Sequence, residues 1–279
     1  MVSKEELLSQ LGNPATPKTV DRLYRFAYLL GSVLERLAHE ALTEEWGADL
    51  FALKKYLAVH VAWSIEQGQY VFNENQLVVS AGSLQTRYGT PLYLIFEPNR
   101  QTDRQPWALT YAGARVSAPQ LPLPPEIPAR PDISKGAEIV MIHDHILGDN
   151  TDRVEFLRHT PPVAQMCAVS GAIQWSINRG LIVPYWYYGR MQCVVPLYLQ
   201  SRENITVAPD LVAPLEISPN NILVRTVLPP HAPYANSRVT VRRHDQLPSW
   251  MLACWHSEAE RMTDEGDDRY FAASGRNGA

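Results

Sequence analysis

The sequence predicts an α+β fold in which N-terminal helices pack on a mainly antiparallel sheet with one long inserted helix. Helical periodicity covers residues 18–68. From about residue 70, short runs of β-branched and aromatic residues alternate with Asn, Gly and Pro turns. One long helical pattern, at residues 163–177, interrupts these runs. Helices followed mostly by strands indicate α+β rather than a regular βαβ series.

The helical part shows two apolar stripes. Leucines, alanines and Phe26 recur at spacings of three and four up to Leu42, and Gly31 divides this stripe into two pieces. A second stripe runs from Leu53 to Ser64 and includes His60. A lone histidine on an apolar face is expected to be a core residue.

The remaining elements follow from period-two runs and their punctuation. Gly180 is the expected cap of the inserted helix, and Tyr188-Gly189-Arg190 joins a hairpin. A last helix is expected at 247–262. The expected strands are 70–72, 76–80, 92–96, 107–111, 137–142, 181–188, 191–199, 205–208, 211–217 and 222–228.

These elements suggest a simple domain organisation. We expect an N-terminal extension over 1–17, a single α+β domain over 18–262, and a flexible tail over 263–279. Within the domain, 18–68 is the helical part and 69–262 the mainly β part. Residues 117–134 are a proline-rich connector, because closely spaced prolines sustain neither a helix nor a central strand. No internal repeat is evident.

Composition excludes several classes of protein. The 279 residues are 46% hydrophobic and 19% charged, with a net charge of −4. This balance is typical of a globular protein and argues against a generally basic nucleic-acid surface. Three scattered cysteines argue against a disulfide framework, and no apolar run reaches the ~20 residues of a membrane helix. The expectation is a cytoplasmic protein without a membrane partner; a homo-oligomer stays open. The GxGxxG, GxxxxGK[ST], GxSxG and HExxH signatures are absent.

The polar run "IHDHILGDNTDR", residues 142–153, is the first candidate site. On a strand, His143 and His145 would share one face and could bind a metal with Asp149 or Asp152. The alternative needs neither metal nor cofactor and makes His145 a general acid or base.

In this second interpretation, Asp144 orients His145, and Asn150 and Arg153 donate to an anionic group. A third, structural interpretation makes Asn150 the N-cap of the next helix. Capping and anion binding are compatible at a helix N-terminus.

A second candidate site lies in "TVLPPHAPYANSRVTVRRH", residues 226–244. If this segment is extended, Tyr234, Asn236 and Arg238 face one way and suit a phosphate or a nucleotide. Arg242 and Arg243 add charge just downstream, although for these two residues alone a solvated strand edge is the favoured interpretation.

Several segments resemble one bacterial family, domain of unknown function 3825. They are "LYRFAYL", "SAGSL", "PLYLIFEPN", "GRMQCVVPLYL" and "TVLPPHAPYANSR", together with Asp144, His145, Ile146, Asn150 and Arg153, and they span roughly residues 22 to 240. The resemblance implies that His143 is incidental. It implies instead a donor-rich set at His145, Asn150, Arg153, Tyr234, Asn236 and Arg238. His231 stands where the family has an acidic residue. Family members occur beside RNA-associated modules, which implies RNA or nucleotide work.

The expected function is therefore binding of a phosphate-bearing ligand, a nucleotide or an RNA end. If the protein is an enzyme, we expect metal-independent phosphoester or phosphoanhydride hydrolysis or transfer. Asp144, His145 and Arg153 would be catalytic, and Asn150, Arg153, His231, Tyr234, Asn236 and Arg238 would bind the ligand. Two alternatives remain: a non-catalytic RNA- or nucleotide-binding module in a stress or regulatory system, and a tailoring enzyme for a nucleoside-like or small anionic metabolite.

Overall fold

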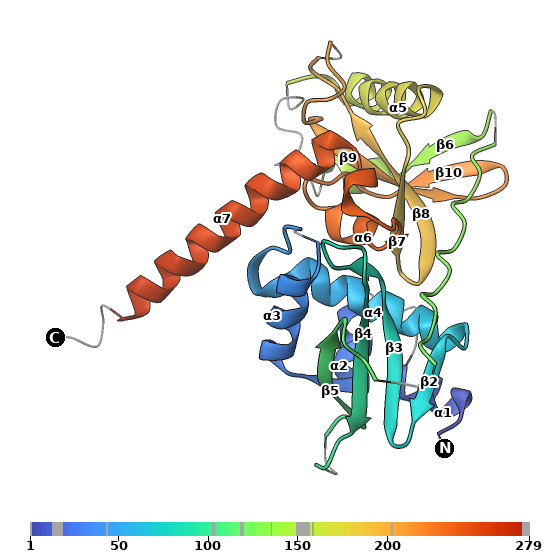
Figure 1. The fold of residues 1–279 in the computed structure, drawn as a ribbon. Helices are drawn as coiled ribbons and strands as arrows, with labels where there is room; N and C mark the ends of the chain where they lie inside the picture. The colour runs from blue at the N-terminus through green and yellow to red at the C-terminus, as the bar shows by residue number, and fades with distance from the viewer. Residues whose placement is uncertain are drawn as a thin grey trace. The chain divides into compact units, whose positions relative to one another are not determined.

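The computed structural model describes residues 2–12, 19–42, 44–101, 104–117, 120–134, 136–148, 157, 159–201 and 203–274 (Figure 1). The chain forms two compact units. Unit 1 comprises Met1–Ile127, Val241–His244 and Ala259–Ala279, and unit 2 comprises Pro128–Thr240 and Asp245–Glu258. The first boundary falls inside the predicted proline-rich connector. That the two units form a single domain remains a prediction.

Unit 1 contains four numbered helices, a short 3-10 turn and one five-stranded sheet among its described residues. The elements are α1 (Lys4–Leu11), α2 (Thr19–Phe26), β1 (Ala27–Leu29), α3 (Gly31–Glu40), η1 (Ala48–Leu50), α4 (Phe51–Glu66), β2 (Tyr70–Asn73), β3 (Gln76–Gln85), β4 (Pro91–Pro98) and β5 (Trp107–Gly113). The strand order is β1-β5-β4-β3-β2. Helix α4 packs against α2, α1 and β3, so it is buried without a break from Tyr56 to Ile65.

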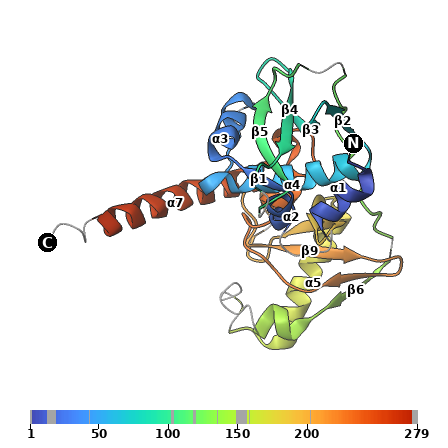
Figure 2. The same cartoon turned by 90° about the horizontal axis from the view of Figure 1, so that it is seen from below.

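Unit 2 has a second five-stranded sheet, with the order β6-β10-β9-β8-β7. The long helix α5 packs against β8 and lies beside the sheet (Figure 2). The core of the unit joins α5 to strands β8, β9 and β10 through Val169, Ile173, Val195 and Leu215. The elements are β6 (Glu138–Met141), η2 (Asp144–Gly148), α5 (Pro162–Asn178), β7 (Val183–Tyr187), β8 (Arg190–Leu197), β9 (Leu211–Ile217), β10 (Asn221–Val224) and α6 (Tyr234–Arg238). The turn η4 (His244–Gln246) and helix α7 (Ser249–Ser274) follow.

The predicted α+β class is confirmed, with two mixed sheets in place of one mainly antiparallel sheet. Four local predictions differ from the structure. Residues 27–29 are a strand within the predicted helical part, and 205–208 are not a strand. After β10 ends at Val224, only a single bridge joins Leu228 to Val212. The backbone of α7 stays helical to Ser274, past residue 263 where a flexible tail was expected.

The two units repeat the same topology. In each, the first strand pairs in parallel with the last, a long helix follows, and the last four strands form an antiparallel meander. The long helix ends in the same letters, Trp-Ser-Ile-x-x-Gly, at 63–68 and at 175–180. Pro-Asn also occurs at the end of the third strand of the meander, at 98–99 and 219–220. No repeat is evident in the sequence, because these identities are too few and too scattered to stand out before the strands are paired.

The shared helix end is a Schellman motif in both units. In unit 1, the N–H of Gly68 donates to the Ile65 carbonyl (3.2 Å) and that of Gln69 to the Ser64 carbonyl (2.7 Å). In unit 2, Gly180 donates to Ile177 and Leu181 to Ser176, both at 3.0 Å. Gly68 and Gly180 have φ of +71° and +69°, which glycine adopts without a Cβ penalty. The role predicted for Gly180 is confirmed.

Lys55 is a partly buried charge of unit 1. It lies on α4, and burial lowers its pKa from 10.5 to about 8. Between these two values the unfolded chain binds a proton that the folded chain does not, so the free energy of unfolding rises with pH across this window. Below about pH 8 the folded protein carries the disfavoured charged form.

We therefore expect Lys55→Met to raise the free energy of unfolding at pH 7 by roughly 1–3 kcal/mol and to abolish its rise between pH 8 and 10.5. Urea denaturation at pH 7, 9 and 10.5 measures both effects. Lys54→Met is the control. Lys54 is the next residue along the chain, but its ammonium group pairs with Asp49 and the pKa of Lys54 is raised rather than lowered. An unchanged pH dependence in Lys55→Met would contradict the effect of burial.

Candidate functional site

The histidine motif lies in unit 2, directly after β6. Asp144 and His145 open the single turn η2 and are exposed, whereas Ile146 is buried in the core. The N–H of Ile146 donates to the Ile142 carbonyl at 3.0 Å, so the chain turns here. The prediction that His143 and His145 share the face of a strand is therefore wrong. Asn150 and Arg153, like Asp149 and Asp152, lie outside the described residues.

The second predicted set is buried in helical structure. Tyr234, Asn236 and Arg238 lie on the five-residue helix α6 with exposures of 1%, 6% and 1%, so the predicted extended conformation is wrong. Pro233 caps α6, and the start of a helix tolerates proline.

The buried side chains of α6 contact the core of unit 2. The ring of Tyr234 stacks on Trp255, with centroids 4.6 Å apart, and Asn236 Nδ2 donates to Tyr185 Oη at 3.0 Å. His231 Nε2 lies 3.8 Å from Glu258 Oε1. Burial raises the pKa of Tyr185, so its hydroxyl stays protonated.

The sheet order of unit 2 separates the two predicted sets. Helix α6 packs against β7 at one edge, whereas η2 follows β6 at the other edge. Four strand spacings of about 4.8 Å lie between these edges, roughly 19 Å. The catalytic and ligand-binding roles of these residues remain predictions from the sequence.

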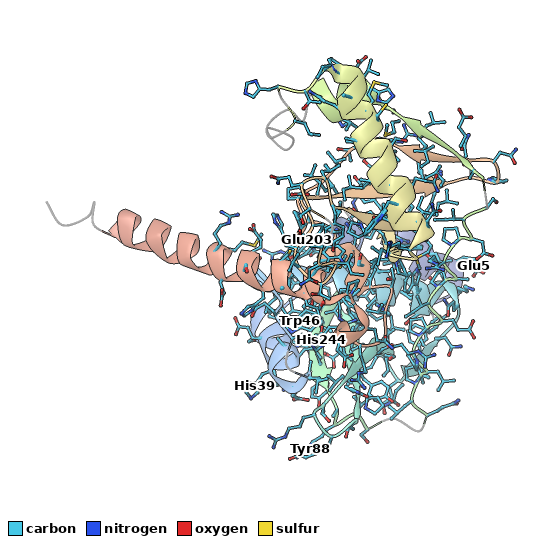
Figure 3. All side chains as sticks on the ribbon, turned by 90° about the horizontal axis from the view of Figure 1, so that it is seen from above. Glu5, His39, Trp46, Tyr88, Glu203 and His244 are labelled. Atoms are coloured by element: carbon cyan, nitrogen blue, oxygen red, sulfur yellow. The ribbon has the colours of Figure 1, made fainter. Side chains whose placement is uncertain are left out.

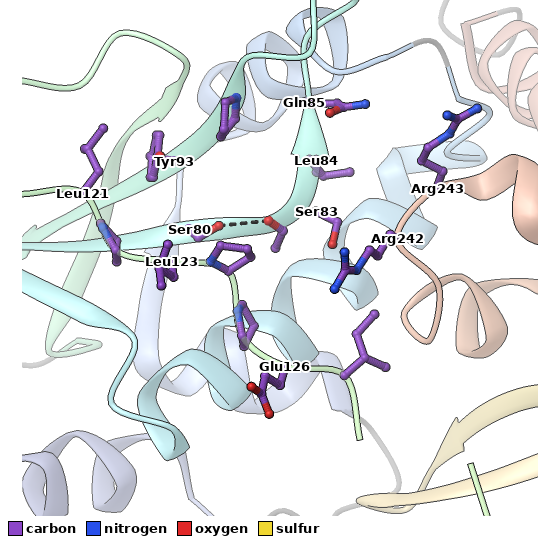
Figure 4. Close-up of a pocket in the computed structure, with 16 residues that line it drawn as sticks. Ser80, Ser83, Leu84, Gln85, Tyr93, Leu121, Leu123, Glu126, Arg242 and Arg243 are labelled. Atoms are coloured by element: carbon purple, nitrogen blue, oxygen red, sulfur yellow. Dashed lines mark hydrogen bonds between the residues drawn. The ribbon is translucent and has the colours of Figure 1, made fainter. Parts of the chain in front are cut away.

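A pocket of about 710 Å³ lies in unit 1 (Figure 4). Its walls come from the end of β3, the start of β4, the proline-rich segment Leu121–Ile127, and Arg242 and Arg243. The lining residues are Ser80, Gly82, Ser83, Leu84, Gln85, Pro91, Tyr93, Leu121, Pro122, Leu123, Pro124, Pro125, Glu126, Ile127, Arg242 and Arg243.

Gly82 shapes the β3 wall of the pocket. Its φ is +65°, and a Cβ here would lie 2.5 Å from Tyr56 Oη and 2.6 Å from His60 Nδ1. The strand can therefore press onto α4 only at a glycine, and its pairing with β4 shifts register between Ser80 and Gln85.

Two hydrogen bonds fix this irregular stretch of β3. Ser80 Oγ donates to the Gly82 carbonyl at 2.9 Å, and the Ser83 N–H donates to Tyr56 Oη at 2.8 Å. His60, expected to be a core residue, stacks on Tyr56 with centroids 4.0 Å apart and is buried, as predicted.

The charged groups of the pocket come from two segments. Arg242 and Arg243 are exposed to solvent and belong to the short stretch Val241–His244 of unit 1. His244 Nδ1 lies 3.6 Å from Glu44 Oε1, and both residues belong to unit 1. Figure 3 labels His244 among the side chains of the chain. Glu126 is the acidic lining residue, so the lining carries two positive charges and one negative charge.

Sequence reasoning named parts of this pocket without joining them. The segment "SAGSL" was one of the motifs that resemble the family, and Arg242 and Arg243 were noted for their charge. Residues 117–134 were predicted to be a connector. Their meeting depends on the Gly82 bulge and on long-range hydrogen bonds, which local patterns do not encode. The glycine inside an apolar strand was the one available signal, because such a glycine marks a bulge or a close approach.

In the part of the chain that the structure describes, no three side chains of His, Cys, Asp and Glu lie close enough together to hold a metal ion. No helix in the same part of the chain has the length and apolarity needed to span a membrane.

The fold and the pocket define an α+β protein built from two units with a five-stranded sheet each, and unit 1 carries an open pocket. Residues 37–247 match the domain of unknown function DUF3825. The match covers more than half of the chain, so the protein belongs to this family, as the sequence motifs predicted. Neither curated proteins nor solved structures give a match.

The bulge at Gly82 can be tested by a matched pair of substitutions. Gly82→Ala should lower the free energy of unfolding by roughly 2–4 kcal/mol, because the new Cβ meets Tyr56 and His60 and the backbone is left-handed. Gly68→Ala, with φ +71° and nothing within 4 Å of the added atom, should cost only about 1 kcal/mol. Equal losses in urea denaturation would mean that Gly82 does not contact α4 closely.

Proposed function

We propose that the protein binds a phosphate-bearing small molecule, a nucleotide, in the pocket of unit 1. The observation that carries the proposal is that Arg242 and Arg243 line one pocket together with apolar, aromatic and uncharged polar side chains and a single carboxylate, Glu126. Guanidinium groups match phosphate oxygens bidentately, and such charge-assisted hydrogen bonds are about twice as strong as neutral ones.

The remaining lining fits the uncharged part of such a ligand. Tyr93, Leu121 and Leu123 offer an aromatic ring and aliphatic surface, while Ser83 and Gln85 offer polar groups for orientation (Figure 4). Apolar and aromatic surface combined with a few polar groups that fix the orientation of the ligand is typical of small-molecule sites. Its volume, about 710 Å³, lies within the range of roughly 300–1,000 Å³ of such sites.

The pocket supports binding more strongly than hydrolysis. Its described lining contains no histidine, cysteine, lysine or aspartate, and Glu126 is the one carboxylate there. Acid–base chemistry at His145, which belongs to unit 2, stays a prediction from the sequence. We therefore favour a nucleotide-binding module over a phosphoester hydrolase.

Titration calorimetry with adenosine 5′-monophosphate tests the proposal on the full chain. Arg242→Gln and Arg243→Gln should each weaken binding by about tenfold or more, because each removes a charge-assisted hydrogen bond worth roughly 1.5–3 kcal/mol. The affinity of the unaltered protein should fall as salt rises.

Arg225→Gln is the matched control for these variants. Arg225 is an exposed arginine of unit 2 whose Nε pairs with Glu216 at 2.8 Å, and its loss should leave binding unchanged. Wild-type affinity in the double variant of Arg242 and Arg243, or no binding by the unaltered protein, would overturn the proposal.

A further inference from the structure

One side chain holds the proline-rich wall of the pocket. Gln67 Nε2 donates to the Glu126 carbonyl at 2.8 Å, and the Glu126 N–H donates to Gln67 Oε1 at 2.7 Å. The amide of Gln67 thus satisfies both backbone groups of one residue, as a neighbouring strand would. The two residues are 59 positions apart, so this contact joins the end of α4 to the segment Leu121–Ile127.

Proline content explains why Glu126 is the point of attachment. Pro122, Pro124 and Pro125 have no backbone N–H and cannot donate to a neighbouring strand. Residues 120–134 accordingly contain no helix or strand. Glu126 directly follows Pro125 and offers both a donor and an acceptor, so a single glutamine fixes a segment that a sheet could not.

Comparison of the two units shows that the fold does not require this contact. Gln67 is the C-cap of α4, and Arg179 is the C-cap of α5 in the same Schellman motif. The Arg179 guanidinium instead lies over the Trp175 ring, 4.9 Å from its centroid. Unit 2 thus builds the same turn and meander with a different residue, and the bonds of Gln67 serve the wall of the pocket.

The anchored residue carries the acidic group of the lining. The Glu126 side chain is exposed and is one of the residues that line the pocket (Figure 4). Gln67 holds the backbone from which this side chain starts. An ionised carboxylate accepts hydrogen bonds and repels phosphate, so it must face a part of the ligand that donates. Two adjacent hydroxyl groups can both donate to one carboxylate, the arrangement by which acidic residues recognise ribose.

We propose that Glu126 accepts hydrogen bonds from the vicinal hydroxyls of a phosphorylated ribose, with Gln67 as its positioning residue, so that the pocket selects ribonucleotides over 2′-deoxyribonucleotides. This inference rests on the proposed function and names its substrate class. Arg242 and Arg243 bind the phosphate, and Glu126 of the proline-rich wall binds the hydroxyls of the sugar.

Competing nucleotides on the full chain test the inference. Calorimetric titrations with adenosine 5′-monophosphate and its 2′-deoxy analogue should give an affinity ratio of about tenfold in favour of the ribonucleotide. Glu126→Ala should bring this ratio close to one, because the ribonucleotide loses two hydrogen bonds and the deoxy analogue, which keeps its 3′-hydroxyl, loses one. The affinity for inorganic phosphate should not fall.

Gln67→Ala should lower the same ratio, because the carboxylate loses its fixed backbone. Gln174→Ala is the control: Gln174 is an exposed glutamine of α5 whose amide bonds Asn178 at 3.0 Å, and its loss should leave the ratio intact. The ratio of the two affinities does not depend on the folded fraction of the protein, so it reports selectivity alone. Thermal unfolding of each variant measures any loss of stability separately.

Three outcomes would decide against the inference. An equal ratio in the unaltered protein and in Glu126→Ala overturns the role of Glu126. Equal weakening of both nucleotides in Gln67→Ala, with the ratio preserved, overturns its positioning role. In both cases, binding that still requires Arg242 leaves the proposed function standing. If neither nucleotide nor inorganic phosphate binds the unaltered protein, the proposed function fails first.

Discussion

The hydrogen-bonded turn at the end of each long helix is the constraint on which both units depend. Its left-handed glycine, Gly68 or Gly180, closes the last carbonyls of the helix and sends the chain directly into the meander. The long helix can then pack against the second strand of that meander, β3 or β8, and build the core. Because the same turn occurs twice, the chain builds one topology twice.

The pocket is formed by features of unit 1 that are not part of the topology shared by the two units. Gly82 lets β3 bend onto Tyr56 and His60, and Gln67, beside the helix-ending glycine, draws the proline-rich segment alongside. The contact of Gln67 is not needed to form the sheet, since unit 2 forms its sheet with Arg179 at the helix end. We therefore associate Gln67 with the pocket rather than with the fold.

The sequence predicted what local periodicity controls, namely the class, the long helices and most strands. It missed β1, because Ala27 and Leu29 continue the apolar pattern of α2 without a break. It misjudged residues 234–238, where alternation of polar side chains suggested a strand but Pro233 starts a helix. The pocket was beyond local patterns, since its walls meet through contacts such as Gln67 with Glu126, which are distant in the sequence.

The most direct measurement of where the ligand binds is a residue-resolved NMR titration of the full chain with adenosine 5′-monophosphate. We expect the largest amide shifts at Ser83 and Gln85 of β3 and at Leu123 and Glu126 of the proline-rich wall, which line the pocket. Shifts confined to Asp144, His145 and helix α6 would contradict this account and return the site to unit 2.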